Sequence, residues 1–263
     1  MPELPEVEVK RKLIERTCAG KTVTAVEAPP SRVLRNVTRA SLRRGLVGRK
    51  LVAARRRAKF VLIEVGGGST LLIHFGMTGD AVFVDGAREF PPYWKARFVF
   101  ADGGSIFYTD PRMFGRIALY PTLDQGGIPD LAGLGPEPLE RSFTFARFGA
   151  ALRSRNTTVH QALMDQRLIA GIGNIYSDEI TWQARVLPYR KTLDLDDGEL
   201  RLLYEKMKWT LRRAVALDAE LDRRKDSFLI PHRGKGGRCP NGHPLESRTI
   251  GGRTSWYCPV EQE

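Results

Sequence analysis

Residues 170–179 read AGIGNIYSDE and join two segments of helical pattern through a Gly-X-Gly turn. Upstream, Thr157 or Thr158 can cap a helix that runs through VHQALMDQRLIA until the first glycine of the turn. Downstream, a second helix is predicted from Asn174 to about Ala184. Glycines allow the backbone to approach a ligand closely, and the second helix presents free N–H groups at its start. The turn therefore suits a phosphate, although an ordinary connection between helices is the favoured interpretation of the fragment alone.

The rest of the C-terminal half is first helical and then glycine-rich. A long amphipathic helix is predicted from about Asp197 to Arg224, because its apolar residues keep a near-helical period. Those residues are Leu200, Leu203, Met207, Leu211, Val215 and Leu221. Beyond it, the segment Arg233–Glu263 contains cysteines and a histidine among glycines, and it is too short to hold a core without help.

The N-terminal half has a different texture. The apolar positions between Glu6 and Cys18 fit one helix, with Gly20 as its stop. Short β-branched runs follow, separated by Gly-rich or Asp-Gly turns: TVTAVEA, KFVLIEV, STLLIHF, DAVFVDG, ARFVFADGGSIFYTD and GRIALYP. This spacing is typical of an antiparallel sandwich or barrel. Residues 1 to about 134 are therefore predicted to form one β-rich domain, and the Gly- and Pro-rich stretch GGIPDLAGLGPEPLE is predicted to be the hinge that follows it.

The chain is strongly basic, with 42 Lys and Arg against 30 Asp and Glu among 263 residues, a formal net charge of +12 and a pI near 9.9. Part of the excess is gathered in two clusters of basic residues. The first is Arg43, Arg44, Arg49, Lys50, Arg55, Arg56, Arg57 and Lys59, and the second is Arg223, Arg224, Lys225, Arg233, Lys235 and Arg238. Nucleic acid is therefore the leading partner, ahead of a merely solvated basic face and, more distantly, an anionic membrane surface.

We expect neither a membrane-spanning segment nor a framework of disulfide bonds. No apolar run reaches the ~20 residues that span a bilayer, and the N-terminus lacks the apolar core of a signal peptide. We therefore expect the protein to stay in the reducing cytosol. Three cysteines make a poor disulfide framework, and Cys239 and Cys258 lie near glycines and a histidine, which indicates a metal site.

Three further pieces carry chemistry. The opening MPELPEVE places Pro2 and Glu3 behind the initiator methionine, which by itself is typical of a helix start. HFGMTG (74–79) and DPRMFGR (110–116) are predicted to be loops at strand ends. A cation beside an aromatic ring in a loop can fill the hole that a base leaves in a duplex. Each piece alone is more typical of core packing or turn chemistry.

Together these pieces resemble a known family. MPELPEVE, a lysine in a basic strand, HFGMTG, DPR-x-FGR, DQRLIAGIGNIYSDE and a C-terminal GGRT are similar to the formamidopyrimidine-DNA glycosylase/endonuclease VIII family, in the same order and over essentially the whole chain. The opening is closer to the formamidopyrimidine branch. The resemblance implies an α+β multidomain protein. Its parts would be an N-terminal catalytic β-sandwich with a leading helix (1–134), a helix-two-turn-helix DNA-binding domain (135–232) and a zinc-finger-like β-hairpin (233–263).

The resemblance also implies a base-excision-repair enzyme, a DNA glycosylase and abasic-site lyase that acts on double-stranded DNA carrying an oxidised base or an abasic site. Removal of Met1 would expose Pro2 as a secondary amine that attacks C1′, forms a Schiff-base iminium and permits β,δ-elimination. Glu3 would be the general acid and base. Lys59 would be the cation that lowers the pKa of the amine.

On the DNA side, the resemblance assigns two groups of residues. Phosphates around the flipped nucleotide would be bound by Lys59, His74, Asn174 and Arg253, and the vacated stack would be filled by Met77, Arg112 and Phe114. The phosphate contacts should dominate affinity and make binding strongly salt-dependent. Met113 stands where many members carry another arginine, which leaves a DNA contact at that position open.

The C-terminal module departs from the family's four-cysteine zinc finger. In CPNGH, Cys239 is followed by glycine at the expected position and by His243 one residue later, and in CPVEQ, Cys258 is followed by Glu261. Zinc accepts all of these ligand types, so a tetrahedral site of Cys239, His243, Cys258 and Glu261 is predicted. The alternative is a metal-free hairpin that keeps its shape through the packing of Trp256, Tyr257 and Leu245.

Other expectations remain open at this stage. DSFLIPHRGKGGR is shorter than the loop that closes over the flipped purine in 8-oxoguanine-excising members, so 8-oxoguanine is expected to be a poorer substrate than formamidopyrimidines, oxidised pyrimidines or abasic sites. The competing hypothesis is a damaged-DNA-binding protein that has lost its chemistry, and an RNA-binding protein is a weaker third. We expect a monomer that is cytoplasmic and nucleoid-associated, of bacterial type, without a small-molecule cofactor.

Overall fold

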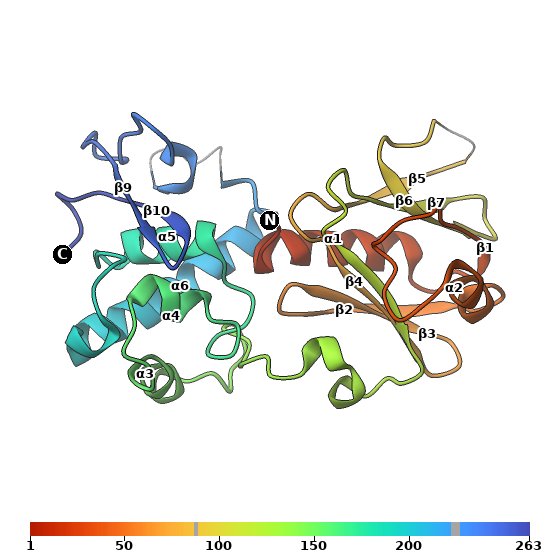
Figure 1. Cartoon of the computed structure of the whole chain (residues 1–263), viewed down its shortest axis with the longest axis horizontal. Helices are drawn as coiled ribbons and strands as arrows, with labels where there is room; N and C mark the ends of the chain where they lie inside the picture. Colours follow the sequence, from red (N-terminus) through yellow and green to blue (C-terminus); the bar gives the residue numbers. More distant parts are fainter. Residues whose placement is uncertain (87–88, 222–226) are drawn as a thin grey trace. The chain divides into compact units, whose positions relative to one another are not determined.

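Two units make up the described part of the chain, residues 1–86, 89–221 and 227–263 of the computed structural model (Figure 1). The first unit comprises Met1–Pro2 and Glu6–Ala132, and the second comprises Glu3–Pro5 and Gly133–Glu263. One peptide bond thus separates Pro2, which belongs to the first unit, from Glu3, which belongs to the second.

The first unit is a β-sandwich of two four-stranded antiparallel sheets, as predicted. Their strand orders are β1-β6-β7-β5 and β2-β3-β4-β8. The strands are β1 (Val23–Glu27), β2 (Leu51–Arg57), β3 (Phe60–Val65), β4 (Ser69–His74), β5 (Asp80–Val84), β6 (Trp94–Phe100), β7 (Ser105–Thr109) and β8 (Arg116–Tyr120). Alternating apolar side chains of both sheets meet in one core, which includes Ile63 and Ile73 from one sheet and Phe98 and Ile106 from the other.

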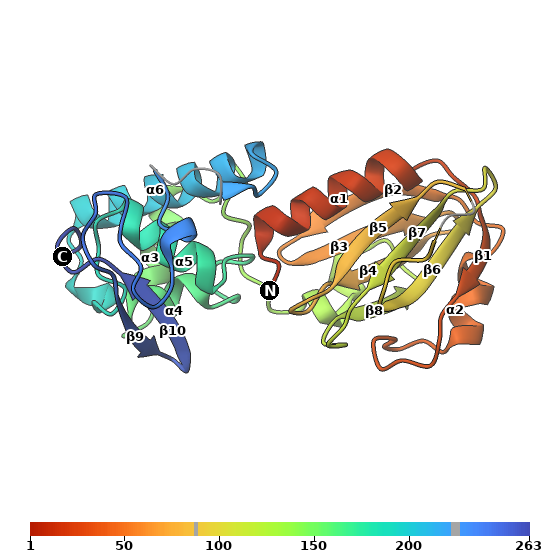
Figure 2. The ribbon, with the colours of Figure 1, turned by 90° about the horizontal axis from the view of Figure 1, so that it is seen from above.

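The leading helix α1 (Leu4–Cys18) supplies Val7 and Ile14 to the same core, and Figure 2 shows it running alongside the strands. It begins two residues earlier than predicted. Gly20, with φ of +80°, allows the turn into β1 that follows the helix.

Two elements of the first unit were not predicted. Helix α2 (Arg39–Leu46) buries only Leu42 and Leu46, too few apolar residues to show a period, although a capping box at Thr38 marks its start. Strand β2 was seen only as a basic cluster, because its buried residues, Leu51 and Ala54, lie three positions apart across a bulge and show no alternation.

The second unit is helical and has its own core. Its helices are α3 (Phe145–Arg153), α4 (Val159–Met164), α5 (Asn174–Gln183) and α6 (Asp197–Ala216). Apolar residues of all four helices form one cluster, which includes Leu152, Leu163, Ile180 and Leu203. The helix-turn-helix at its centre confirms the predicted helical domain.

Two predicted helix ends in this unit were wrong. Helix α4, capped by Thr158, ends at Met164 and does not continue to the glycine turn, because Asp165 leaves the helical conformation and accepts a hydrogen bond from the Arg167 N–H. Helix α6 ends at Ala216, where residues of positive φ follow, and the predicted end at Arg224 lies outside the described residues.

The hairpin of β9 (Glu246–Ile250) and β10 (Arg253–Tyr257) belongs to the second unit and turns through Gly251 and Gly252, both at positive φ.

Gly- and Pro-rich sequence before the second unit forms two short 3-10 helices, Gln125–Gly127 and Pro129–Leu131. Among the described helices, none is long and apolar enough to cross a membrane.

Candidate functional site

The Glu3 carboxylate lies in a cradle of backbone N–H groups at the start of α5. Its Oε2 accepts from the N–H of Gly173 at 2.6 Å and of Tyr176 at 3.3 Å, and its Oε1 accepts from the N–H of Ile175 at 2.9 Å. The side chain is 2% exposed. Helix α5 has no capping side chain of its own, so Glu3 satisfies donors that would otherwise lack a partner. The carboxylate is held in one position.

The glycines of the central turn make this cradle possible. A Cβ on Gly173 would lie 2.5 Å from the carboxyl carbon of Glu3, and a Cβ on Gly171 would lie 3.0 Å from Leu4. The carbonyl of Gly171 also accepts from the Leu4 N–H at 3.0 Å. The glycines of the GIG turn thus allow the N-terminal segment to pack directly against the backbone of the turn. The sequence pattern did not indicate this contact.

Two other predicted catalytic residues belong to the first unit. Pro2 is half-buried, and Lys59 is 7% exposed. Lys59 lies in the two-residue turn between β2 and β3, where Ala58 has a φ of +52°, a conformation that costs energy for a residue with a Cβ. A buried ammonium group at a strained turn is unlike the solvated lysine that ends most strands.

His74, at the end of β4, is neutral at physiological pH. Burial, together with the nearby cations Arg116 and Lys59, lowers its pKa to about 4. Its Nδ1 accepts from the Gly76 N–H at 3.1 Å, so the proton of the neutral ring is on Nε2. His74 can therefore offer one N–H donor to a ligand without carrying a charge.

The loops HFGMTG and DPRMFGR are locked together by the buried carboxylate of Asp110. It accepts from Thr78 Oγ1 at 2.7 Å, from the Gly115 N–H at 2.8 Å and from the Tyr108 hydroxyl at 3.3 Å. A Cβ on Gly76 would come within 2.5 Å of the Gly115 nitrogen, so the two loops pass in direct contact. Asp110 was not singled out from the sequence.

These loops hold the three residues predicted to fill the base stack. Met77 and Phe114 are 39% and 51% exposed, which is unusual for large apolar side chains. Arg112 is also exposed, with its guanidinium 5.0 Å from the Phe114 ring centre. The cation and the ring therefore form one projecting pair.

Arg32 is a further member of this group that the sequence did not indicate. Its guanidinium donates to the carbonyls of Arg112 and Met113 and lies 5.6 Å from the Phe114 ring centre. Met113 has a φ of +54° and packs against the core of the sandwich, so this side chain is structural.

Asn174, the first residue of α5, is fixed by its neighbours. Its Nδ2 donates to the Thr254 carbonyl at 2.9 Å, so its Oδ1 faces His160 Nε2 at 3.1 Å and that nitrogen must carry the proton. Burial lowers the pKa of His160 to about 4, which keeps the ring neutral. Among the described residues only the Thr254 carbonyl accepts from Nδ2, so its second hydrogen can be donated to a ligand.

A buried carboxylate ties the hairpin to α5. Asp178 accepts from Ser255 Oγ at 2.6 Å, from the Trp256 N–H at 3.1 Å, and from Arg233 through Nε and Nη2, both at 2.8 Å. Burial raises the pKa of Asp178 to about 6, against the lowering by Arg233. This network fixes the strand that carries Arg253, whose exposed side chain extends from the first residue of β10.

The basic clusters are partly structural. Arg233 pairs with a buried aspartate, Arg56 pairs with a glutamate of α1, and Arg49 and Arg238 donate to backbone carbonyls. Arg223, Arg224 and Lys225 lie outside the described residues. A count of the basic residues in the two clusters therefore overestimates how many side chains can contact a polyanion.

Three of the four predicted metal ligands come together. The ligand atoms of Cys239, His243 and Cys258 lie within 4.8 Å of one another, and both cysteines are buried. Ligand atoms around one tetrahedral zinc ion are about 3.5 Å apart, and Cys239 Sγ lies 3.6 Å from His243 Nδ1. Two thiols and an imidazole are a donor set that suits zinc.

Glu261, the fourth predicted ligand, lies beside this group. Its carboxylate is 3.2 Å from His243 Nδ1, but it also accepts from Asn241 at 2.7 Å and pairs with Arg185 at 2.6 Å. Among the described residues it is not a member of the close ligand group. The apolar packing of the hairpin is present as well, since Leu245 and both cysteines share a cluster.

The chain is similar to known proteins over its whole length. A family model described as the formamidopyrimidine-DNA glycosylase N-terminal domain matches residues 1–117, and one described as the H2TH domain of the same enzyme matches residues 134–225. The formamidopyrimidine-DNA glycosylase of Thermus thermophilus is 36% identical over 277 residues, covering 100% of this chain and 98% of that protein. The corresponding protein of Pelotomaculum thermopropionicum is 33% identical, covering 100% and 99%.

Solved structures agree. The chain is similar to Lactococcus lactis Fpg in complex with FAPY-dG-containing DNA, with a TM-score of 0.89 and 28% identity over 99% of this chain and 100% of that one. It is equally similar to the same protein in complex with DNA containing an abasic site, with a TM-score of 0.88 and 28% identity over 99% of each chain.

Proposed function

Because the chain belongs to the formamidopyrimidine-DNA glycosylase family, we propose that it is a base-excision-repair enzyme that removes oxidised bases from double-stranded DNA and then cuts the abasic strand. The observation that carries the proposal is the Glu3 carboxylate, held by three backbone N–H groups and joined by one peptide bond to Pro2. The proposed nucleophile, Pro2, and the proposed proton carrier, Glu3, are thus neighbours in the chain. The Glu3 carboxylate is held in place by its hydrogen bonds.

The reaction begins with the N-terminal amine. Removal of Met1, which a small second residue permits, frees the nitrogen of Pro2 as a secondary amine with a pKa near ~8. A cation close to the amine favours its neutral form, and Lys59 is the residue that we propose for this role. The amine attacks C1′ of the damaged nucleoside, the N-glycosidic bond breaks, and the base leaves with a proton.

Glu3 moves the protons of the later steps. It protonates the opened sugar oxygen, and the resulting iminium acidifies C2′ so that the 3′ phosphate is expelled by β-elimination and the 5′ phosphate by δ-elimination. The backbone donors around the carboxylate restrict it to one orientation, which is what efficient proton transfer requires.

DNA is held by donors on both units. His74 Nε2, Lys59, the second amide hydrogen of Asn174 and the guanidinium of Arg253 would bind backbone phosphates. The projecting side chains of Met77, Arg112 and Phe114 would occupy the stack that the flipped nucleotide vacates. Their contacts with the neighbouring bases would offset part of the free-energy cost of unstacking.

A bound zinc ion would join the residues on either side of the hairpin and would take no part in the reaction. Cys239, His243 and Cys258 would hold it, with Glu261 as the nearest candidate for a fourth ligand. Its role would be to keep Arg253 in place.

The preferred lesion is proposed to be other than 8-oxoguanine. The described part of the segment after α6 is tightly packed, with Phe228 and Leu229 buried and Arg233 in an ion pair. Little of it is left to close over a purine. Comparable excision of 8-oxoguanine and dihydrouracil from matched duplexes would contradict this assignment.

The experiment that tests the function uses an abasic-site duplex and protein shown by mass to lack Met1. The expected products carry phosphates at both ends of the gap, and protein that retains Met1 should not produce them. Tight binding without cleavage by the processed protein would favour the alternative, a damaged-DNA-binding protein without chemistry.

A further inference from the structure

A groove of about 500 Å³ lies on the outer face of α6, within the second unit. Its lining includes Glu205, Trp209, Arg212 and Ala216, which follow one another at helical spacing and therefore share one face of the helix. The size is that of many ligand pockets, which range over roughly 300–1,000 Å³. None of the residues proposed to act in the reaction or to bind DNA lines this groove.

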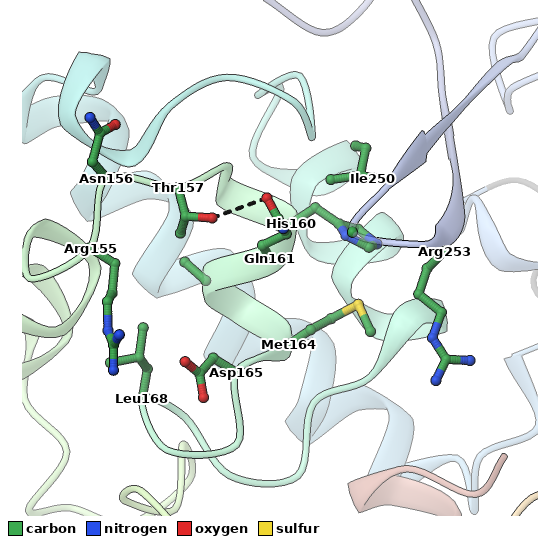
Figure 3. Close-up of a pocket in the computed structure, with 12 residues that line it drawn as sticks. Arg155, Asn156, Thr157, His160, Gln161, Met164, Asp165, Leu168, Ile250 and Arg253 are labelled. Carbon is green, nitrogen blue, oxygen red and sulfur yellow. Dashed lines mark hydrogen bonds between the residues drawn. The ribbon is translucent and has the colours of Figure 1, made fainter.

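The groove and the β9–β10 hairpin lie on different sides of the second unit. Helix α5 packs against both α6 and β10, and Figure 2 shows α6 and the hairpin on opposite sides of α5. On the hairpin side, Arg253 extends beside α4 (Figure 3). A ligand in the groove of α6 would therefore leave Asn174 and Arg253 uncovered.

Trp209 gives the groove an exposed aromatic surface. The side chain is 43% exposed, and its ring stacks on the buried ring of Phe228 with the ring centres 5.6 Å apart and an interplanar angle of 12°. The stack holds one face of the indole in place, while the rest of the ring is open to a ligand. Large aromatic rings that are already fixed are common at the centres of protein interfaces.

Lys208 is a buried cation without a carboxylate partner among the described residues. It is 9% exposed, and its Nζ donates to the Glu140 carbonyl at 3.2 Å and lies 5.1 Å from the Tyr204 ring centre. An ammonium group has three donors, and only one of them is used within this part of the chain. A buried charge is costly without a counter-ion, so an anion that reaches Nζ would make a strong interaction.

Two further cations lie at the rim of the groove. Arg212 and Arg213 are exposed, and neither guanidinium has an ion pair or hydrogen bond with residues 1–86, 89–221 or 227–263. Among the lining residues that the structure describes, Glu205 is the one acid. The groove thus combines a mostly apolar surface with a net positive charge.

These features favour a carboxylate-rich partner over a nucleic acid. A carboxylate at the end of a flexible side chain can reach the nearly buried Nζ of Lys208, whereas a phosphodiester is held in a backbone between two sugars. An apolar side chain of the same partner would cover the indole of Trp209. A second copy of this chain is disfavoured, because a symmetric contact would bring Arg212 and Arg213 against the same two residues.

We propose that this groove is a docking site for an acidic peptide segment of a partner protein. An aromatic or large aliphatic side chain of the segment packs against Trp209, and its carboxylates pair with Lys208, Arg212 and Arg213. The inference goes beyond the proposed function, because it gives α6 a protein partner and leaves the DNA contacts of the second unit unobstructed.

A labelled peptide, Gly-Asp-Asp-Phe-Asp-Asp-Gly, is the probe, and its binding to the full chain is measured by fluorescence anisotropy at low and moderate salt. One matched peptide carries asparagine in place of every aspartate, and another carries serine in place of the phenylalanine. We expect saturable binding of the parent peptide that weakens with salt. Either matched peptide should bind roughly tenfold more weakly or less still.

Two variants test the groove itself. Arg212→Glu reverses an exposed charge, and Lys208→Met removes the buried ammonium while keeping an apolar stem. The matched control is Arg147→Glu, which makes the same change of charge at an exposed position of α3 outside the groove. We expect Arg212→Glu and Lys208→Met each to weaken peptide binding roughly tenfold, and Arg147→Glu to bind the peptide like wild type.

The contrary outcomes are distinct. Failure of wild type to bind the peptide, or equal peptide affinities for wild type, Arg212→Glu and Arg147→Glu, would overturn the docking site. Weaker binding of oligothymidylate or of abasic duplex by Arg212→Glu than by Arg147→Glu, without peptide binding, would assign the groove to nucleic acid. Sedimentation with phosphatidylglycerol vesicles that Arg212→Glu alone abolishes, again without peptide binding, would assign it to a membrane surface. Cleavage of abasic DNA at equal rates by Arg212→Glu and Arg147→Glu, with peptide binding lost only in the former, would support the proposal.

Discussion

Gly173→Ala should impair catalysis without straining the backbone. Gly173 has φ of −132° and ψ of −160°, an extended conformation open to any residue. The added methyl group would lie 2.5 Å from the Glu3 carboxyl carbon, whereas ordinary contact begins near 3.4 Å. The carboxylate must therefore move by 3.4 − 2.5 = 0.9 Å, or the start of α5 must move by the same amount.

The magnitude follows from the bonds that this movement strains. Hydrogen bonds to a charged group contribute about 1.5–3 kcal/mol each. Losing the equivalent of one of the three bonds should lower the free energy of unfolding by about 2 kcal/mol. A misplacement near 1 Å costs roughly 100-fold in rate, which is about 2.7 kcal/mol in the activation free energy.

Single-turnover cleavage of abasic DNA and urea unfolding measure the two effects. Gly149→Ala, in the middle of α3, is the matched control, because nothing lies within 4 Å of the added methyl group. It should leave the cleavage rate unchanged and raise the free energy of unfolding by about 0.5–1 kcal/mol. A folded Gly173→Ala protein that cleaves at the wild-type rate would refute the claim that the cradle positions Glu3.

The remaining predictions concern four other parts of the molecule. Arg233→Ala should lower the free energy of unfolding by about 3–5 kcal/mol in denaturant titration, because it leaves the buried carboxylate of Asp178 unpaired; a loss below 1 kcal/mol would contradict this. Asp110→Asn should weaken binding to abasic DNA through loosened loops while metal content stays the same. For His74, whose pKa falls from 6.5 to about 4 on folding, the unfolded chain binds more protons between these values. Stability should therefore fall by up to about 3 kcal/mol as pH drops from 6.5 to 4, and His74→Gln should flatten that part of the profile. Cys258→Ala should reduce zinc content from one ion to none by mass spectrometry under native conditions.

Local patterns predicted much of the fold. The alternation of the strands, the Gly-X-Gly turn and the period of α6 each depend on neighbours in sequence, so they are visible in one chain. The misses have local causes too: α2 is short, the buried residues of β2 do not alternate, and α4 ends at an aspartate turn although the sequence there still has a helical pattern.

The residues of the candidate site were predicted through family motifs. The hydrogen bonds and ion pairs that hold these residues in place were not predicted. The bond from the Gly173 N–H to Glu3 joins residues 170 positions apart, and no local pattern encodes such a pair. The same holds for Asp178 with Arg233, for His160 with Asn174, and for the interlocked loops around Asp110. From the sequence alone, such residues look like ordinary polar positions, because their partners are distant in the chain.

Borohydride reduction during reaction with abasic DNA, followed by mass spectrometry of the cross-linked peptide, tests the central claim most directly. The account predicts a stable adduct on the nitrogen of Pro2 in protein that has lost Met1, and a Glu3→Gln variant with slowed elimination. An adduct on a lysine side chain, or no adduct from protein whose N-terminus is confirmed to be Pro2, would contradict it.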